Sequence, residues 1–484
     1  MKDSEKLFEA IGDIRSDQIE DAEERSLKPG RARRRLWFGA IAALLAVAMV
    51  AGYFALPGGR GTSAYAISEP VYPDTAAYPR EENYFSEDGE FDSDAYSEDY
   101  EAWWEDKRAK PDASGYAGEL EDYFTAITGQ LLSGAGSGNA ACSPLNVYMA
   151  LAMLAELTGG ESREQILALL GADSIESLRR QANDIWNASY IDDGVTSSIL
   201  AASVWLNEYV SFDQDTLDTL AENYYAASYS GEMGSAEFNG ALQSWLNEQT
   251  GGLLSDQVGD IELSAETVLA LATTVYFRAK WVDEFAESAN TREVFHTPDG
   301  DVAAEFMHQS GVGTYYRGEN FGAVSRYLHN DGVMWFILPD EGVSVDEVLA
   351  SGEYMSLLLD SEGWEEAYRP RINLSVPKFD VSSQLDLSEG LKALGVTDVF
   401  DPVAGDFTPM TDMDGIFVSQ AVHGARVAID EEGVTAAAYT VIANAGAGMP
   451  PEEEIDFTLD RPFIYAITTG GSLPLFTGVV NDPA

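Results

Sequence analysis

The hydrophobic pattern predicts a folded region from about residue 115 to residue 484. Residues 144–157 (PLNVYMALAMLAEL) are apolar nearly all round and follow Ser143, so they predict a capped, buried helix. Residues 162–170 and 238–248 are amphipathic and predict two further helices. Short β-branched or aromatic runs bounded by Gly, Pro or Asp predict strands at 268–277, 333–338, 372–379, 425–429 and 473–480. Because helices and strands are mixed without regular alternation, the pattern favours an α+β fold.

An apolar segment lies far outside this region. Residues 36–56 (LWFGAIAALLAVAMVAGYFAL) carry no charge, and a helix of that length just spans a hydrocarbon core of about 30 Å. Basic residues gather in the preceding segment 1–35, and acidic residues follow the apolar run. The positive-inside rule then predicts a single-pass cell-membrane protein with a cytoplasmic N-terminus and the folded region outside the cell. The alternative is secretion after cleavage near Ala66, because Ala64-Tyr65-Ala66 fits a small-x-small cleavage pattern.

Residues 57–114 differ in composition from both neighbours. They are rich in Pro, Tyr, Ser, Asp and Glu and show no apolar period that a helix or strand could use. This composition predicts an extended, disordered acidic linker that repels itself. The interleaved tyrosines and Trp103-Trp104 leave a second interpretation open, namely a recognition segment.

Charge and residue counts exclude several classes of function. The chain of 484 residues has 28 Lys and Arg against 82 Asp and Glu, a formal net charge of −54. That balance excludes unaided nucleic-acid binding and favours cationic partners. Cys142 is the one cysteine, so no intramolecular disulfide can form, and we expect it to be a small buried side chain. The four histidines form no metal-ligand pattern, and no nucleophile elbow or phosphate-binding loop is present. We therefore expect no cofactor, no metal and no catalytic residue.

The stretch 429–451 (IDEEGVTAAAYTVIANAGAGMPP) is unusual for so acidic a protein, because no charge follows Glu432. As an extended strand it would place small residues on one face (Val434, Ala436, Ala438, Thr440) and Thr435, Ala437, Tyr439 and Val441 on the other. Residues 443–448 (ANAGAG) indicate an exposed loop that a protease could reach. By composition alone, a plain glycine-rich connection between strands explains the segment equally well.

This segment resembles the hinge and reactive-centre loop of the serpins, and other motifs of that family occur in order over about 370 residues. They are Ser143-Pro144-Leu145-Asn146 and Leu157-Thr158-Gly159-Gly160, Thr274 to Trp281 (TVYFRAKW), Met307-His308-Gln309, Val376-Pro377-Lys378-Phe379, His423, Asp460-Arg461-Pro462-Phe463, and Pro474 to Asn481 (PLFTGVVN). The resemblance implies a serpin fold of about nine helices around three β-sheets, with an exposed reactive-centre loop. Together with the apolar segment it suggests a membrane-anchored, bacterial-type member.

What the resemblance implies for function is a suicide inhibitor rather than an enzyme. A target serine protease, or possibly a cysteine protease, would attack the loop, and the cleaved loop would enter the main sheet while the protease is still acyl-linked. The hinge would comprise Glu431, Glu432, Gly433, Val434, Thr435, Ala436, Ala437 and Ala438, and family spacing places the reactive bond at Ala447–Gly448. A small residue there suits elastase-like or subtilisin-like enzymes. The alternative is a non-inhibitory serpin that acts as a binding or carrier module; in either case we expect a monomer.

Two further sites follow from the resemblance. Trp281 corresponds to the family's breach tryptophan, and the shutter cluster corresponds to Ser143, Asn146, Thr273 and His423. This chain has Asn146 where a second serine is usual and Thr273 where asparagine is usual. We hypothesise that Asn146 supplies the hydrogen bonds of the missing asparagine. The alternative is that His423 is a satisfied core histidine without a role in a switch.

Overall fold

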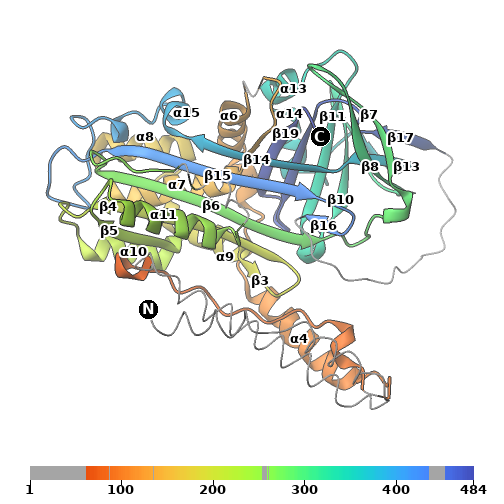
Figure 1. Ribbon diagram of the computed structural model, residues 1–484, viewed down its shortest axis with the longest axis horizontal. Coiled ribbons are helices and arrows are strands. Elements are labelled where there is room, and N and C mark those ends of the chain that lie inside the picture. Colours follow the sequence, from red (N-terminus) through yellow and green to blue (C-terminus); the bar gives the residue numbers. More distant parts are fainter. Residues whose placement is uncertain are drawn as a thin grey trace, which may run out of the picture. The chain divides into compact units, whose positions relative to one another are not determined.

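Three β-sheets organise the part of the chain that the structure, a computed structural model, describes (Figure 1). The described residues are 62–86, 88–133, 136–252, 259, 261–434 and 453–483, and they lie within one compact unit that spans residues 60–484. Eleven α-helices surround the sheets in these ranges, against the nine or so that the family resemblance suggested. The mixture of helices with three sheets confirms the predicted α+β class.

The largest sheet, called the main sheet below, has eight strands in the order β1-β5-β4-β6-β16-β15-β14, with β3 paired to β4. The two-residue strand β16 touches both β6 and β15, and β6 and β15 also pair with each other, in parallel. The bounds are Ala66–Ser68 (β1), Ile191–Asp192 (β3), Ser197–Asn207 (β4), Ala226–Gly231 (β5), Leu269–Lys280 (β6), Phe379–Asp386 (β14), Val418–Ile429 (β15) and Gly433–Val434 (β16).

The other two sheets are mostly antiparallel. A seven-stranded sheet has the order β12-β9-β10-β11-β18-β19-β2, and a four-stranded sheet has the order β17-β13-β8-β7. The first contains Ala140–Cys142 (β2), Tyr315–Arg317 (β9), Phe321–Tyr327 (β10), Val333–Pro339 (β11), Ala367–Tyr368 (β12), Phe463–Thr468 (β18) and Pro474–Val480 (β19). The second contains Thr291–Thr297 (β7), Gly300–Val312 (β8), Arg371–Pro377 (β13) and Glu454–Thr458 (β17).

Helices cover both faces of the main sheet. On one face α11 lies across the strands (Figure 1), and its Phe238, Leu242 and Trp245 pack in a cluster with side chains of β4, β5 and β6. On the other face α7 is buried along its whole length. The α-helices are Ser93–Ala109 (α4), Tyr116–Glu119 (α5), Glu121–Leu132 (α6), Pro144–Leu157 (α7), Gly160–Leu170 (α8), Ile175–Ser189 (α9), Gln214–Tyr224 (α10), Ala236–Gln249 (α11), Val345–Ser351 (α13), Glu353–Leu359 (α14) and Ser388–Ala393 (α15). Short 3-10 turns are Thr62–Ala64 (η1), Glu81–Tyr84 (η2), Glu287–Ala289 (η3), His329–Asp331 (η4) and Asp398–Phe400 (η5).

The predicted core elements are confirmed. Helix α7 begins and ends where the apolar run predicted, and the Ser143 hydroxyl accepts a hydrogen bond from the Asn146 N–H as its N-cap. The five predicted strand runs coincide, to within one residue at their ends, with parts of β6, β11, β13 with the start of β14, β15, and β19. Cys142 is fully buried, as a small apolar side chain is expected to be.

The expectation of a disordered linker over residues 57–114 is wrong for the residues described there. Helix α4 forms with Asp92 as N-cap, and Trp103 is only 8% exposed. Further upstream, β1 pairs antiparallel with β5 and extends the main sheet. The sequence does contain a helical pattern here, although acidic residues obscure it. Aromatic residues recur at helical spacing, and neighbouring rings contact one another (Tyr96, Tyr100, Trp103, Trp104).

The prediction of a single-pass membrane protein is not upheld, and we withdraw it. Within the described ranges, the helices fall short of the length and apolar character that crossing a bilayer requires. The segment on which the prediction rested, residues 36–56, lies outside the described residues, as do residues 1–35. Length and hydropathy motivated that prediction, and they do not by themselves establish a membrane helix.

Candidate functional site

The first residues of the predicted hinge enter the main sheet as the two-residue strand β16. Gly433 pairs with Lys280 of β6, and Val434 pairs with Ala279 of β6 and with Ile429 of β15. Val434 is 1% exposed, so its side chain faces the core, as the alternating pattern predicted for this position. The start of the hinge is therefore already a short strand between β6 and β15.

A tight turn carries the chain from β15 into β16. The Asp430 N–H donates to the Gly433 carbonyl at 3.0 Å, and the Asp430 carboxylate accepts the N–H groups of Glu432 at 2.9 Å and Gly433 at 3.1 Å. Gly433 has no room for a side chain, because a Cβ there would lie 2.3 Å from the Ala279 carbonyl oxygen. Glycine at this position thus allows the close approach of two backbones.

Trp281 fastens this turn to the end of β6. Its side chain is fully buried, and its indole N–H donates to the Asp430 carbonyl at 2.9 Å. Its backbone N–H donates to the Glu432 carbonyl at 3.0 Å, and the Phe285 N–H donates to the Glu431 carbonyl at 2.9 Å. The sequence-predicted breach tryptophan and the sequence-predicted hinge are therefore brought into direct contact.

Ion pairs hold one side of the hinge. Lys378 Nζ lies 2.6 Å from Glu431 and 2.9 Å from Glu305, and Asn290 donates to both carboxylates. Burial is the largest single effect and opposes ionisation of Glu431, but the hydrogen bonds from Lys378, a backbone N–H and Asn290, together with the charge of Lys378, outweigh it, so the pKa of this carboxyl is lowered overall. Sequence reasoning missed the role of Lys378, whose only signal was its place between Pro377 and Phe379, where β13 gives way to β14.

Acidic side chains also gather around Glu284, which follows the end of β6. Burial raises the pKa of Glu284, and the neighbouring Glu432 and Asp430 raise it further, although Lys280 at 3.9 Å acts in the other direction. The Glu432 Oε2 atom is buried and has no hydrogen-bond partner in the described part of the chain. Three acidic side chains therefore crowd the point where the hinge enters the sheet.

The shutter residues lie deeper in the sheet, where β6 and β15 pair directly. His423 is fully buried, and burial lowers its pKa to about 4, so the imidazole is neutral at pH 7. The Ser143 N–H donates to His423 Nε2 at 2.9 Å, which makes Nε2 the acceptor. The proton therefore sits on Nδ1 and is donated to Thr273 Oγ1, 3.1 Å away. Three of the four predicted shutter residues are joined in one chain of hydrogen bonds.

Asn146 does not supply the hydrogen bonds that we predicted for it. It is fully buried on α7, but neither its amide nitrogen nor its amide oxygen has a hydrogen-bond partner among the described residues. The hypothesis that it replaces the missing asparagine is thus wrong for this state of the sheet, because Thr273 alone occupies the His423 Nδ1 atom. The interpretation of His423 as a satisfied core histidine fits these contacts equally well.

Strands β6 and β15 pair directly with each other only over their first halves, away from β16. Below β16, β15 pairs in parallel with β6 from Val418 opposite Leu269 to Gly424 opposite Thr274. The remaining predicted hinge residues, Thr435, Ala436, Ala437 and Ala438, and the predicted reactive bond Ala447–Gly448 lie outside the described residues. They belong to segment 435–452, which leads from β16 to β17 in the four-stranded sheet. Among the described residues, His, Cys, Asp and Glu side chains form no group of three or more that could hold a metal ion.

Comparisons with known proteins cover the same part of the chain. A family model described as Serpin (serine protease inhibitor) matches residues 121–483. Serpin-ZX of Arabidopsis thaliana is 29% identical over 370 residues, which cover 72% of this chain and 93% of that protein. Tengpin, a thermophilic serpin solved in its native state, aligns with a TM-score of 0.68 at 25% identity, over 76% of this chain and 94% of tengpin.

A further solved structure is similar in fold alone. Human thyroxine-binding globulin complexed with thyroxine aligns with a TM-score of 0.67 at 20% identity, over 76% of this chain and 99% of that protein. The curated relatives compared come from plants and mammals, so they lend no support to the expectation of a bacterial-type member.

Proposed function

Because this chain belongs to the serpin family, we propose that it is a suicide-type inhibitor of serine proteases that traps its target by inserting the cleaved loop into the main sheet. The observation that carries the proposal is the position of Gly433 and Val434 between β6 and β15, two strands that pair directly with each other farther along. A strand that begins at this point and continues in the same direction would have to separate β6 from β15.

The register of β16 supports insertion of the residues that follow. When both partner strands are advanced by two residues at a time, Ala436 comes between Val427 and Phe277, and Ala438 comes between Ala425 and Val275. All four partners are at most 7% exposed, so their side chains face the core. Alanine fits such positions without a charge to bury or a large side chain to accommodate.

The next step of the register reaches the shutter. Thr440 would come between Thr273 and His423, whose side chains hydrogen-bond each other in the closed sheet. Insertion would then replace a parallel contact between β6 and β15 by two antiparallel contacts, which are slightly more stable per residue. The added stability of the antiparallel pairing supports insertion of the cleaved loop that is not reversed.

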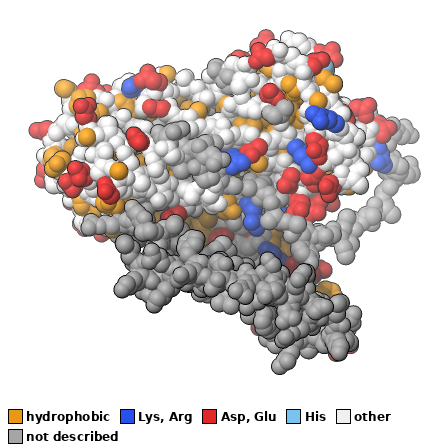
Figure 2. All heavy atoms as spheres, in the orientation of Figure 1, with side chains coloured by type: hydrophobic (Ala, Val, Ile, Leu, Met, Phe, Trp, Pro, Cys, Tyr) orange, Lys and Arg blue, Asp and Glu red, His pale blue; other side chains and the backbone are white. Residues whose placement is uncertain are grey.

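The proposed reactive bond is Ala447–Gly448, and the proposed targets are elastase-like or subtilisin-like enzymes. A small, uncharged residue fits a shallow apolar specificity pocket and offers nothing to the acidic pocket of trypsin-like enzymes. On the face shown in Figure 2, acidic side chains are widely spread and basic ones are few, in keeping with the net charge of −54. This field would speed encounter with cationic proteases, and salt would screen the effect.

The deciding experiment mixes the full-length protein with an elastase and with a subtilisin, followed by denaturing gels and mass spectrometry. We expect an adduct that survives denaturation and a released peptide that begins at Gly448. Cleavage at this bond without an adduct would overturn the inhibitory proposal and favour the non-inhibitory binding or carrier role. Cleavage elsewhere with an adduct would leave inhibition intact and show that the bond is misplaced.

A variant tests the reactive bond separately. Ala447→Arg should redirect inhibition towards trypsin, because the arginine side chain then meets the acidic pocket of that enzyme. Gly448→Ala is the matched control, since it changes the following residue and should leave trypsin uninhibited. Trypsin inhibition by neither variant would mean that Ala447 is not the residue that enters the protease pocket.

A further inference from the structure

An arm made of η2 and α4 leads away from the three sheets and their helices, which are called the body of the fold below (Figure 1). The arm comprises the described residues among 80–109, and Phe85 and Phe91 pair as an antiparallel bridge where its chain turns back. Within α4, Trp103 is the one buried residue. The family model begins at residue 121, so the arm lies outside the matched region. Its surface therefore needs an explanation of its own.

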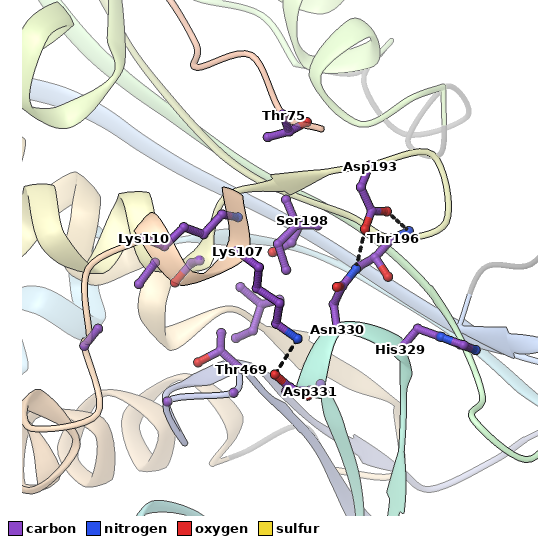
Figure 3. Close-up of a pocket in the computed structure, with 18 of the residues that line it drawn as sticks. Thr75, Lys107, Lys110, Asp193, Thr196, Ser198, His329, Asn330, Asp331 and Thr469 are labelled. Atoms are coloured by element: carbon purple, nitrogen blue, oxygen red, sulfur yellow. Dashed lines mark hydrogen bonds and ion pairs between the residues drawn. The ribbon is translucent and has the colours of Figure 1, made fainter. Parts of the chain in front are cut away.

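The base of the arm is fixed to the body by polar contacts. The Trp103 indole N–H donates to the Asp193 carboxylate at 3.0 Å, and the Asn330 amide donates to the same carboxylate at 2.7 Å. Lys107 forms an ion pair with Asp331 at 2.6 Å (Figure 3). These contacts hold α4 at its C-terminal end, so the rest of the helix is presented to solvent from a fixed base.

Aromatic rings form a continuous series along the arm. The ring centres of successive neighbours lie 5.1, 5.4, 6.0 and 5.6 Å apart (Phe85, Phe91, Tyr96, Tyr100, Trp103). Several rings of the arm nevertheless stay largely exposed (Phe85 52%, Phe91 39%, Tyr100 40%, Trp104 39%). Single exposed apolar side chains are ordinary, but a group of exposed rings on one short segment indicates an interaction surface.

Acidic side chains surround these rings. Twelve of the 30 residues from 80 to 109 are Asp or Glu and three are Lys or Arg, whereas the whole chain has 82 acidic residues among 484. Two of the three cations, Lys107 and Arg108, lie over the Trp104 ring at 5.3 and 5.9 Å from its centre. The arm thus already combines cations with ring faces, a contact that is favourable for both lysine and arginine. Its charge and its rings both favour a cationic partner.

We propose that the arm is a docking surface for a basic protein that presents neighbouring arginine and lysine side chains. The ring faces of Phe85, Phe91 and Tyr100 receive these side chains, and the carboxylates around the rings pair with their charges. A second copy of this chain is disfavoured, because two such arms repel each other. An anionic lipid surface is disfavoured for the same reason.

The test is fluorescence anisotropy of labelled peptides titrated with the full-length protein. The probes are peptides of equal length that alternate glycine with arginine, with lysine or with glutamate. We expect the arginine and lysine peptides to bind saturably and to lose affinity as salt is added, and we expect the glutamate peptide not to bind. No saturable binding of either cationic peptide, or equal binding of the glutamate peptide, would overturn the proposal. The readout does not involve protease inhibition, so it is independent of the proposed function.

A pair of matched double variants separates the arm from the general negative charge of the protein. Phe85→Leu with Tyr100→Leu removes two ring faces, keeps apolar side chains at both positions and leaves the charge unchanged. Cationic-peptide affinity should fall about 5- to 30-fold, as expected for two exposed cation–ring contacts. Tyr209→Leu with Tyr327→Leu is the control, because these rings are 76% and 65% exposed and lie outside the arm. Equal affinities of the two double variants would refute docking on the arm.

A second pair tests the carboxylates of the arm. Glu98→Gln with Glu101→Gln removes two charges from exposed positions on α4 and should weaken peptide binding about 2- to 30-fold. Glu161→Gln with Glu164→Gln removes the same charge from exposed positions on α8 and should leave the affinity close to that of the wild type. An equal loss in both double variants would show that the peptides bind to the overall negative surface, which would contradict the proposal.

Discussion

At position 433, the close approach of a neighbouring strand allows no residue type other than glycine. Its φ angle is not in the left-handed region, so turn conformation does not explain the glycine. The reason lies in space: the position of a Cβ is already taken by the Ala279 carbonyl oxygen at 2.3 Å and the Lys280 Cα at 2.8 Å. Backbone atoms of a central strand cannot yield as a flexible side chain could.

Gly433→Ala should therefore destabilise the protein, by about 1–3 kcal/mol as is typical of overpacking. Gly240→Ala serves as the control, because apart from its chain neighbours and the backbone of α11 itself no atom lies within 4 Å of a Cβ at this position. Alanine there should stabilise by about 0.5–1 kcal/mol through its better helix propensity. The melting temperatures of the two variants should shift in opposite directions, and a shift of the same sign in both would disprove the argument.

Asn146 presents the opposite situation, since a polar group is buried without partners. Asn146→Leu should raise the stability of the closed sheet by about 1–3 kcal/mol, because an unpaired buried amide is replaced by an apolar group of similar shape. Asn239→Leu is the matched control on α11: its amide is bonded in both directions to the backbone of Leu263. That change should lower the melting temperature, whereas equal effects of the two substitutions would contradict the assignment of Asn146 as unpartnered.

At the scale of elements, the apolar pattern of the sequence predicted the helices and strands that form the core. It did not predict α4, which packs on the body of the fold through a few aromatic rings. The α7 run needed no context, because every position on that helix is buried. Helix α4 is different: Trp103 is its one buried side chain, and acidic residues dominate its composition. The contact that orders it, from the Trp103 indole to Asp193, joins residues 90 positions apart and leaves no local trace in the sequence.

The candidate site was predictable to the same extent. Family motifs pointed to the start of the predicted hinge, to Trp281 and to Ser143, Thr273 and His423, which the structure joins by hydrogen bonds, but the hydrogen bonds at each depend on register. Because Asn146 stands where a serine is usual and Thr273 where an asparagine is usual, we expected Asn146 to supply the hydrogen bonds of the missing asparagine. Whether its amide reaches His423 depends on the distance between α7 and β15, which the sequence does not state. The ion pair of Lys378 with Glu431 likewise depends on how β14 and β15 pair, which local sequence does not state.

The ionisation of Glu284, next to the end of β6, makes the stability of the protein depend on pH. The pKa of Glu284 is raised in the folded state, so folding favours its protonated form and stability falls as pH rises above the unfolded value of about 4.5. Glu284→Gln should then raise the melting temperature at pH 7.5 and lose this advantage as the pH approaches 4.5. Thermal scans between pH 4.5 and 8 measure the difference.

Two other glutamates serve as comparisons for the Glu284→Gln prediction. Glu287→Gln, three residues farther along, removes the same charge from an exposed side chain and should leave the pH profile of the wild type unchanged. Glu431 has a lowered pKa, so its stabilising contribution is present at neutral pH and is lost only below about 4.5. It therefore does not cancel the effect of Glu284 within the range scanned. A Glu284→Gln profile parallel to the wild-type profile would rule out the raised pKa.

For the whole molecule, the decisive feature is that β6 and β15 pair with each other over Leu269–Thr274 and Val418–Gly424, while β16 lies between them at the other end. The proposed mechanism requires the loop to extend from β16 past Phe277 and Val275, which lie outside the paired stretch, and then to separate β6 from β15 at the His423–Thr273 hydrogen bond. Residues that enter the sheet on the core face must be small and uncharged, while those on the other face meet no such demand. This asymmetry distinguishes strand insertion from any mechanism in which the loop is merely cut.

Ala436→Glu and Thr435→Glu test that asymmetry with the same new side chain at adjacent positions. In the extended register, the carboxylate introduced by Ala436→Glu would be buried beside Phe277 and Val427 without a counter-ion, whereas the one introduced by Thr435→Glu would lie on the opposite face beside the half-buried Arg278. We expect Ala436→Glu to convert the protein from an inhibitor into a substrate, with at least a roughly tenfold rise in inhibitor consumed per protease trapped. Thr435→Glu should keep an adduct yield close to that of the wild type. Titration of residual elastase or subtilisin activity against inhibitor concentration gives both numbers, and equal behaviour of the two variants would show that the loop does not enter the sheet in this register.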